Sequence, residues 1–436
     1  MTPTSSNWSA FIFSTFRPMT LRNYTPLWLC ALVLTALPLH SDTISTRVQP
    51  QVVQTKASDN ILLHKPSKIT AGDSLTLRLN HLLDDPLFDE TQVGIFVYDL
   101  TVGRRVYAHH ERQRMRPASC QKLVTAITAL HTLGTNYQYH TDLFLSPEND
   151  TTGKKVTIYL RAGYDPLLDH DDLKAFATAL QKEGIERIET PLILDCSLKD
   201  EDERGWGWCW DDKTVPLTPL LYKNKDRFVE TFREVLAEKG IEWDGRTTLG
   251  TCPDQATRIC QRSHTIDQIL LPMMKESDNS VAESLFYQLA AKSGKRWAGR
   301  KQAVPYIKEV VKSLGLNPRD YLFADGSGLS LYNYTSAELL GKLLIFAYDH
   351  PEVYRHLLPS LPVAGEDGTL ERRMRGSATR GNVKAKTGTV EGVSTLAGYC
   401  TNANGHTLCF AILNQGVKRT ADGRDFQDKV CNLLCE

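Results

Sequence analysis

Two absences limit what this chain of 436 residues can be. It has no excess of charge of either sign, because 51 Lys and Arg residues balance 51 Asp and Glu residues. A protein that binds nucleic acid usually carries a basic excess, so we expect no nucleic-acid partner. The chain also lacks the CxxC…CxxC and HExxH patterns that hold zinc. We therefore predict neither a metal site nor another cofactor.

Long hydrophobic runs are scarce as well. The one that stands out, Leu27–Leu39, has about 13 residues, fewer than the roughly 20 that a transmembrane helix needs. Arg22 precedes this run and Ser41 follows it, a pattern typical of a secretory signal peptide. We predict that residues 1–41 are such a signal, with Met19 as a natural alternative start. The mature protein is then exported to the periplasm without a stable membrane span; the alternative is an uncleaved anchor.

Ten cysteines are present, and an exported protein can form disulfides. Spacing alone does not determine which of them pair. Cys400 and Cys409 flank Asn404-Gly405, a strong signal for a two-residue hairpin turn. Counting outward from that turn sets the two cysteines opposite each other in a non-hydrogen-bonded pair, where side chains lie closest. We predict neighbouring sulfurs that could form a disulfide; the alternative is two small apolar strand residues.

Hydrophobic residues make up 41% of the chain and charged residues 23%, which is typical of globular proteins. Residues 42–75 are polar and irregular, and we predict that they form a linker leading into the fold. Strand patterns over residues 92–108 and 384–413 flank a largely helical stretch. This order favours one mixed α/β domain that is closed by strands from both ends of the chain.

The pattern of predicted strands and helices changes in the middle of the chain. A strand-helix-strand pattern over residues 155–195 indicates a β-α-β unit. We therefore predict that residues 137–260 form an inserted domain. The catalytic domain is then built from residues 76–136 and 261–436.

Ser119-Cys120-Gln121-Lys122 is the only Ser-x-x-Lys sequence in the chain, and it opens a predicted apolar helix. Residues three apart lie on one face of a helix, so the hydroxyl and the amine can meet. Serine is a weak nucleophile that needs an adjacent base. A lysine becomes such a base where burial or nearby positive charge lowers its pKa. The alternative, a helix-capping serine beside a solvated lysine, fits poorly with the apolar surroundings.

A second motif, Ser277-Asp278-Asn279, precedes another predicted helix. Ser280 and Glu283 look like a capping box for that helix, which would leave the three polar residues in the loop at its start. Loop side chains at a helix start can point into a cleft. A copy of the tripeptide at residues 58–60 lies in the polar linker, and we interpret it as a plain loop.

A third motif, Lys386-Thr387-Gly388, lies in a strand pattern. A glycine in a strand often marks the close approach of another backbone, as a peptide substrate would require. The similar sequence Lys292-Ser293-Gly294 lies at a predicted helix C-terminus, where glycine is a common stop signal. We interpret that copy as a helix cap.

The order Ser-x-x-Lys, Ser-x-Asn, Lys-Thr-Gly is shared by penicillin-binding proteins and class A β-lactamases. From about Gly94 to Val417 the chain resembles low-molecular-mass, class C penicillin-binding proteins of the penicillin-binding protein 4 type, which are D-Ala-D-Ala carboxypeptidases and endopeptidases. The resemblance implies an α/β (α+β) serine β-lactamase/DD-peptidase-like transpeptidase fold. In that fold an antiparallel sheet is flanked by helices, and a second domain is inserted after the nucleophile helix. Further segments that carry the resemblance are residues 163–166, 206–212, 325–330 and 393–399.

The resemblance also implies roles for the motif residues. Ser119 would attack the carbonyl of the penultimate D-Ala of a peptidoglycan stem peptide. Lys122, neutral in the free enzyme, would accept the serine proton, and Lys386 would depress the pKa of Lys122 by like-charge repulsion. Ser277 would pass the proton to the departing amine. β-Lactams would be covalent inhibitors.

The substrate itself would be held by residues of the second and third motifs. Asn279 would hydrogen-bond the substrate backbone, and Lys386 with Thr387 would hold its terminal carboxylate. The oxyanion would lie between the backbone N–H groups of Ser119 and Thr389. Asp278 and Gly388 complete the expected substrate-binding set.

Three alternatives stay open. A β-lactamase of class A would need a Glu for deacylation, and no Glu-x-x-Leu-Asn sequence lies between Asn279 and Lys386. An esterase on the same fold would hydrolyse simple esters without releasing D-Ala. A non-catalytic penicillin-binding sensor would be acylated without turnover. The balance between carboxypeptidase and endopeptidase is not decided by the sequence.

Overall fold

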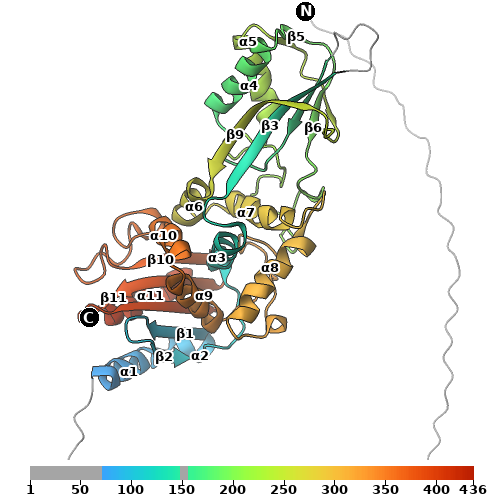
Figure 1. The fold of residues 1–436 in the computed structure, drawn as a ribbon. Helices are drawn as coiled ribbons and strands as arrows, with labels where there is room; N and C mark the ends of the chain where they lie inside the picture. Colours follow the sequence, from blue (N-terminus) through green and yellow to red (C-terminus); the bar gives the residue numbers. More distant parts are fainter. Residues whose placement is uncertain (1–70, 148–155) are drawn as a thin grey trace, which may run out of the picture. The chain divides into compact units, whose positions relative to one another are not determined.

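The computed structural model describes residues 71–147 and 156–436 (Figure 1). The predicted signal peptide 1–41, with its alternative start Met19, lies outside the described residues, as does most of the predicted linker 42–75. Helix α1 (Ala71–Leu82) begins before that linker was expected to end. Within the described ranges, no helix combines the length and the hydropathy needed to cross a membrane.

Strands from both ends of the described chain form one antiparallel sheet of five strands, in the order β10-β11-β12-β1-β2. The strands are β1 (Gln92–Asp99), β2 (Arg104–His109), β10 (Lys384–Val390), β11 (Val393–Thr401) and β12 (Thr407–Gln415). Strand β11 is buried along almost its whole length because both faces of the sheet are covered. The expected antiparallel sheet, closed by the two ends of the domain, is confirmed.

Helices cover both faces of this sheet (Figure 1). Helices α1 and α11 (Thr420–Cys435) pack on one face, next to the short α2 (Leu87–Glu90). The other face packs against a layer of six helices: α3 (Gln121–Leu133), α6 (Ile266–Lys275), α7 (Asn279–Ala291), α8 (Arg300–Ser313), α9 (Ala337–Asp349) and α10 (Pro351–Ser360). Three short 3-10 turns complete these layers: η1 (Ala118–Cys120), η2 (Pro318–Asp320) and η3 (Gly368–Leu370).

Helix α3 is the centre of the helical layer. Every residue from Gln121 to Leu130 is buried, as expected of a helix that is apolar nearly all round. The nucleophile motif lies where η1 passes into this helix. The sequence from 119 to 122 is therefore set on a rigid, fully packed element.

A second sheet lies between α3 and α6 in the sequence, in the order β8-β6-β4-β3-β9. Its strands are β3 (Gln138–Pro147), β4 (Val156–Arg161), β6 (Leu192–Asp195), β8 (Thr247–Leu249) and β9 (Thr257–Thr265). Helices α4 (His170–Lys182) and α5 (Phe228–Glu238) pack on it around a separate apolar core, beside the two-stranded sheet of β5 (Arg187–Ile188) and β7 (Glu242–Trp243).

The expected β-α-β unit is present in this second sheet, because β4 and β6 are parallel and α4 connects them. The predicted domain boundary at residue 260 falls inside strand β9, which continues to Thr265. The division into 76–136 with 261–436 and an insert of 137–260 stays a prediction.

The predicted pairing of Cys400 with Cys409 is wrong. Cys400 lies opposite Leu408, and Cys409 lies opposite Tyr399. The cause is the turn, which runs over residues 402–406 because its first asparagine accepts hydrogen bonds from two backbone N–H groups inside the loop. A shift of one residue in register moves a side chain to the other face of the sheet.

The two thiols consequently belong to different layers. The Cys400 thiol shares a hydrogen bond with the thiol of Cys435 in α11. The Cys409 thiol faces the Gly341 carbonyl of α9 at 3.9 Å. All nine cysteines of the described ranges are free thiols.

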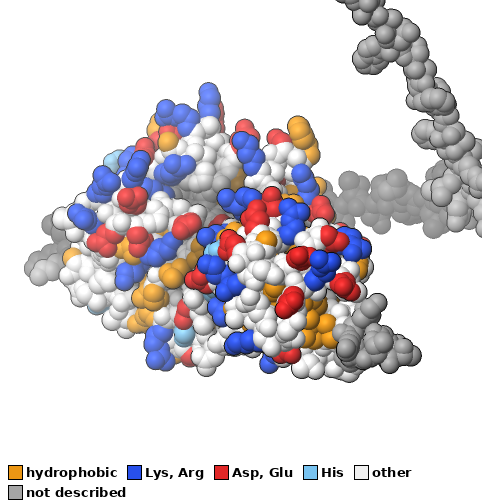
Figure 2. All heavy atoms as spheres, turned by 90° about the horizontal axis from the view of Figure 1, so that it is seen from above, with side chains coloured by type: hydrophobic (Ala, Val, Ile, Leu, Met, Phe, Trp, Pro, Cys, Tyr) orange, Lys and Arg blue, Asp and Glu red, His pale blue; other side chains and the backbone are white. Residues whose placement is uncertain are grey.

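Charged side chains of both signs are interspersed over the face seen in Figure 2. Several surface pairs are in direct contact, for example Arg227 with Glu230 at 3.1 Å. This mixture agrees with the balanced composition of the whole chain. The absence of a nucleic-acid partner stays a prediction.

Candidate active site

Ser119 lies in the turn that leads into α3, next to a strained backbone position. Ala118 has a φ of 45°, in the left-handed region that residues with a Cβ atom adopt at a cost. The Ser119 side chain is half-buried, neither free in solvent nor sealed in apolar packing. Lys122, one turn later, places its Nζ 3.0 Å from Ser119 Oγ. The two residues of the first motif therefore meet as predicted from their spacing.

Lys122 is fully buried, and its amine has two further partners. Nζ donates to Asn279 Oδ1 at 2.7 Å and to the Ser327 carbonyl at 2.9 Å. A neutral amine has two N–H donors and one lone pair. With both donors engaged in this way, the lone pair points at the Ser119 hydroxyl, which is the geometry required of a general base.

The charge state of Lys122 is set by opposing effects. Burial lowers its pKa to about 8, although Asp325, Glu283 and Asp278 act to raise it. The expected neutral state of Lys122 in the free protein stays a prediction.

The expected lowering of the Lys122 pKa by Lys386 stays a prediction. Burial and the charge of Lys122 hold the pKa of Lys386 well below its usual range. The positive charge of Lys122 thus helps to lower the pKa of Lys386. The low pKa of Lys122 is an effect of burial.

The second motif lies at the start of α7. Ser277 has a φ of 62°, a second strained position beside the site, and is half-buried. The carboxylate of Asp278 accepts from the Val281 N–H at 3.0 Å and from Asn224 Nδ2 at 2.8 Å. Asp278 is thus the N-cap of α7. Its expected contact with substrate stays a prediction.

The predicted capping box of Ser280 and Glu283 is wrong. The helix begins at Asn279, so Ser280 lies within its first turn and Glu283 lies in its buried interior. An N-cap residue needs an extended backbone, and Asp278 is the residue that has it.

The third motif lies on β10, the edge strand nearest the nucleophile turn. Lys386 Nζ donates to Ser277 Oγ at 2.8 Å, which joins the third motif to the second. The Cys120 thiol donates to the Lys386 carbonyl at 3.2 Å, which joins it to the first. Thr387 is half-buried and Thr389 is exposed. The three motifs, far apart in sequence, meet at one place.

Gly388 marks a close approach, but of the protein's own backbone. A Cβ atom at this position would lie 2.2 Å from Thr395 Oγ1, 2.8 Å from the Pro117 carbonyl and 2.9 Å from the Ser119 nitrogen. Strand β10 therefore runs directly against the nucleophile turn. The glycine positions Ser119 whether or not it also contacts a substrate.

Gly388→Ala is expected to displace the nucleophile turn. Overpacking of this kind typically costs about 1–3 kcal/mol of folding stability. We expect a lower midpoint of chemical denaturation and slower reaction of Ser119 with penicillin. Gly392→Ala is a nearby control, since a Cβ there meets no atom within 4 Å, although its positive φ of 71° adds strain of its own. Unchanged labelling in the Gly388 variant would contradict the tight packing.

The turn of residues 325–330, a segment that carries the resemblance, lies beside Lys122 and contacts it through the Ser327 carbonyl. Asp325 is buried and accepts hydrogen bonds from Trp208 Nε1 at 2.8 Å and from the Gly328 and Ser330 N–H groups. Asn333 Nδ2 donates to the same carboxylate at 2.7 Å. This carboxylate shapes the turn that carries the Ser327 carbonyl. The only signal in the sequence was the resemblance of residues 325–330 to the family.

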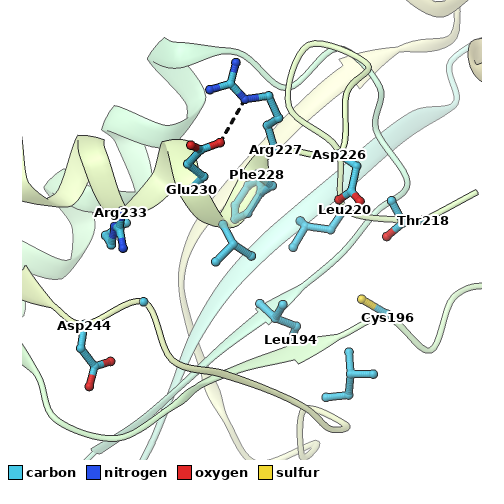
Figure 3. Close-up of a pocket in the computed structure, with 13 residues that line it drawn as sticks. Leu194, Cys196, Thr218, Leu220, Asp226, Arg227, Phe228, Glu230, Arg233 and Asp244 are labelled. Atoms are coloured by element: carbon cyan, nitrogen blue, oxygen red, sulfur yellow. Dashed lines mark hydrogen bonds and ion pairs between the residues drawn. The ribbon is translucent and has the colours of Figure 1, made fainter. Parts of the chain in front are cut away.

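A cavity of about 240 Å³ adjoins the second motif. Ser277, Asp278 and Asn279 line one side, and residues of the second-sheet region, among them Trp208 and Lys213, line another. A larger cavity of about 530 Å³ lies within the second-sheet region, beside α5 (Figure 3). None of the residues predicted for the site lines that larger cavity.

Among the described residues, no group of three or more His, Cys, Asp or Glu side chains is arranged to hold a metal ion.

The chain is similar in sequence to known D-Ala-D-Ala carboxypeptidases. The sequence profile of the D-Ala-D-Ala carboxypeptidase 3 (S13) family matches residues 75–220 and 213–436. The chain is 25% identical over 419 residues to the D-alanyl-D-alanine carboxypeptidase DacB of Haemophilus influenzae, covering 77% of this chain and 87% of that protein. It is 26% identical over 435 residues to a D-alanyl-D-alanine carboxypeptidase of Actinomadura sp., covering 78% of this chain and 80% of that protein.

Solved structures share the fold. The crystal structure of penicillin binding protein 4 from Haemophilus influenzae superimposes with a TM-score of 0.74 at 23% identity, covering 82% of this chain and 99% of that one. A peptidoglycan endopeptidase of Bdellovibrio bacteriovorus, Bd3459, gives a TM-score of 0.51 at 17% identity, covering 79% of this chain and 92% of that one. The predicted fold class is confirmed.

Proposed function

This chain belongs to the D-Ala-D-Ala carboxypeptidase 3 (S13) family, and from this membership we propose that it is a serine-type D-Ala-D-Ala carboxypeptidase or endopeptidase. Its substrates are peptidoglycan stem peptides, cleaved through an acyl-enzyme on Ser119. The observation that carries the proposal is the Lys122 amine, 3.0 Å from Ser119 Oγ, with both remaining donors engaged by Asn279 and Ser327.

Acylation starts from the neutral form of Lys122. Ser119 Oγ attacks the carbonyl carbon of the penultimate D-Ala, and the hydroxyl proton passes to Lys122 Nζ. When the tetrahedral intermediate collapses, the carbon–nitrogen bond breaks and the departing amine takes up a proton. Ser277 relays to that amine the proton that Lys122 took from Ser119, which leaves Lys122 neutral again; its Oγ lies 2.8 Å from Lys386 Nζ at the same site. Water then hydrolyses the ester to release the acyl group and restore Ser119.

Substrate binding falls to the third motif and its surroundings. The oxyanion lies between the N–H groups of Ser119 and Thr389, since β10 runs against the nucleophile turn. One such donor is typically worth about 10²–10³ in rate. Lys386 and Thr387 hold the terminal carboxylate, whose negative charge favours the protonated form of the Lys386 amine. Asn279 and Asp278 contact the substrate from the start of α7.

β-Lactams are covalent inhibitors in this proposal. The Haemophilus influenzae penicillin binding protein 4 has been solved in complex with a β-lactam, and Bd3459 has been solved acylated by penicillin G. The protein acts on the cell wall outside the cytoplasmic membrane, in the periplasm, which agrees with the signal peptide predicted over residues 1–41.

Incubation with purified sacculi tests the proposal. We expect released muropeptides to lose their terminal D-Ala if the protein is a carboxypeptidase, or to lose cross-links if it is an endopeptidase. Penicillin added beforehand should prevent either change. Sacculi left intact by folded protein, or rapid hydrolysis of nitrocefin instead, would overturn the proposal in favour of a sensor or a β-lactamase.

A further inference from the structure

Glu283 is a buried carboxyl group that none of the proposed steps uses. It lies on α7, one helical turn after Asn279, and is only 1% exposed. Its Oε1 accepts from the Gly326 N–H at 3.1 Å and from the Ser327 N–H at 2.8 Å. A carboxyl group is costly to bury unless its oxygens accept hydrogen bonds, as these do.

The segment that Glu283 holds is the one that contacts the base. The Ser327 peptide bonds to Glu283 through its N–H and to Lys122 through its carbonyl. The neighbouring Gly326 carbonyl accepts from Thr125 Oγ1 of α3 at 2.7 Å. Helix α7 therefore supplies one acceptor of the Lys122 amine directly, through Asn279, and sets the second indirectly, through Glu283.

Glu283 also acts on Lys122 through its charge. Burial, reinforced by the negative charge of Asp325, raises the pKa of Glu283 to about 8, while an ionised Glu283 raises the pKa of Lys122. Below a pH of about 8 Glu283 is mostly uncharged, so it does not raise the pKa of Lys122. The titratable groups that face Lys122 or Glu283 from the surrounding elements are Asp278, Asp325, Cys120, Lys386, Tyr164 and Tyr287.

We propose that Glu283 is a positioning residue for the general base. Through the Gly326–Ser327 segment it aims the Lys122 lone pair at Ser119, and its ionisation restrains the release of the proton from Lys122. The proposal rests on the proposed function, because it assumes that Lys122 activates Ser119.

The experiment measures the second-order rate constant of Ser119 acylation by a fluorescent penicillin across a range of pH. In the wild-type protein we expect this rate constant to rise with pH through about 8, because only neutral Lys122 accepts the proton. Glu283→Ala releases the Gly326–Ser327 segment. A displacement of the base of about 1 Å is enough to cost roughly 10²-fold in rate at every pH.

Glu283→Gln separates the charge from the geometry. An amide oxygen in the place of Oε1 keeps both N–H bonds, but the side chain cannot ionise. We expect the rise in rate to move to lower pH, with the rate at its plateau retained within a few-fold, which a purely structural role would not produce. The same substitution at Glu338, a buried glutamate of α9 paired with Arg112 and Lys342, is the matched control and should leave the profile unchanged.

The outcomes separate this proposal from the proposed function. If wild-type protein is not acylated at Ser119, the proposed function fails. If wild-type protein is acylated but the Glu283→Gln profile coincides with it, the proposed effect of Glu283 ionisation on Lys122 is overturned. A Glu283→Ala protein with the wild-type rate would overturn it as well. If the alanine variant does not fold, the pH profile of the glutamine variant still tests whether the charge of Glu283 acts on Lys122.

Discussion

Replacing Ser119 with alanine is expected to abolish covalent labelling by penicillin. The proposed acyl-enzyme needs an oxygen nucleophile within reach of a base, and Ser119 Oγ lies 3.0 Å from Lys122 Nζ. Removing the hydroxyl leaves no atom in that position for the acyl group. Intact-protein mass spectrometry after penicillin treatment should therefore show an adduct in the wild-type protein and none in Ser119→Ala.

The matched control for this variant is Ser293→Ala. Ser293 belongs to the Lys-Ser-Gly copy that follows α7, where its hydroxyl donates to the Ala290 carbonyl. This variant should be labelled as fully as the wild-type protein. An adduct that survives Ser119→Ala, or wild-type protein that folds but gains no mass, would end the acyl-enzyme proposal.

Lys122→Met is expected to lose nearly all acylation. Methionine retains the buried aliphatic stem but removes the amine that takes the Ser119 proton. General-base catalysis of this kind contributes about 10²–10⁴ in rate. The measured quantity is the rate constant of penicillin labelling, with circular dichroism recorded on the same sample to establish that the variant is folded.

Folding of this variant has a cost of its own. Asn279 Oδ1 and the Ser327 carbonyl each lose the Lys122 donor, and a buried acceptor left unpaired costs about 1–3 kcal/mol. Against this, an amine no longer has to be buried. Lys292→Met, in the copy of the third motif, is the control for the substitution and should label normally. A folded Lys122→Met protein that labels at the wild-type rate would remove Lys122 from the role of base.

The elements of the central sheet were readable from the sequence because their signals are local. The alternation after Gln92 and the strand patterns between residues 384 and 413 correspond to β1, β10, β11 and β12. The apolar helix after Ser119 is buried as expected. The limit of such signals is visible at Cys400 and Cys409, where one asparagine side chain in the loop changes the register. The turn dipeptide Asn404-Gly405 does not by itself reveal the hydrogen bonds of Asn402 that lengthen the loop.

In the candidate site too, features that depend on local spacing were predictable and features that depend on distant partners were not. The contact between Ser119 and Lys122 was predictable because spacing along a helix is local: residues 119 and 122 share a face in any helix. The residues that position them were not found. Glu283 was interpreted as part of a capping box, and the segment of Asp325 was marked only by the resemblance, because both residues have partners in segments distant in the sequence. Hydrogen bonds between segments distant in the sequence produce no periodic pattern of residues by which they could be predicted.

By itself the sequence determined which chemical groups are available: one Ser-x-x-Lys pair, a Ser-x-Asn and a Lys-Thr-Gly, in an order shared with penicillin-recognising enzymes. Only the tertiary structure decided how they act together. The packing of α3, α7 and β10 buries Lys122 and Lys386 and thereby lowers their pKa values. The same packing supplies the Ser327 carbonyl as a partner for the base. Burial and distant hydrogen bonds exist only once the chain has folded, since they depend on segments that the sequence separates.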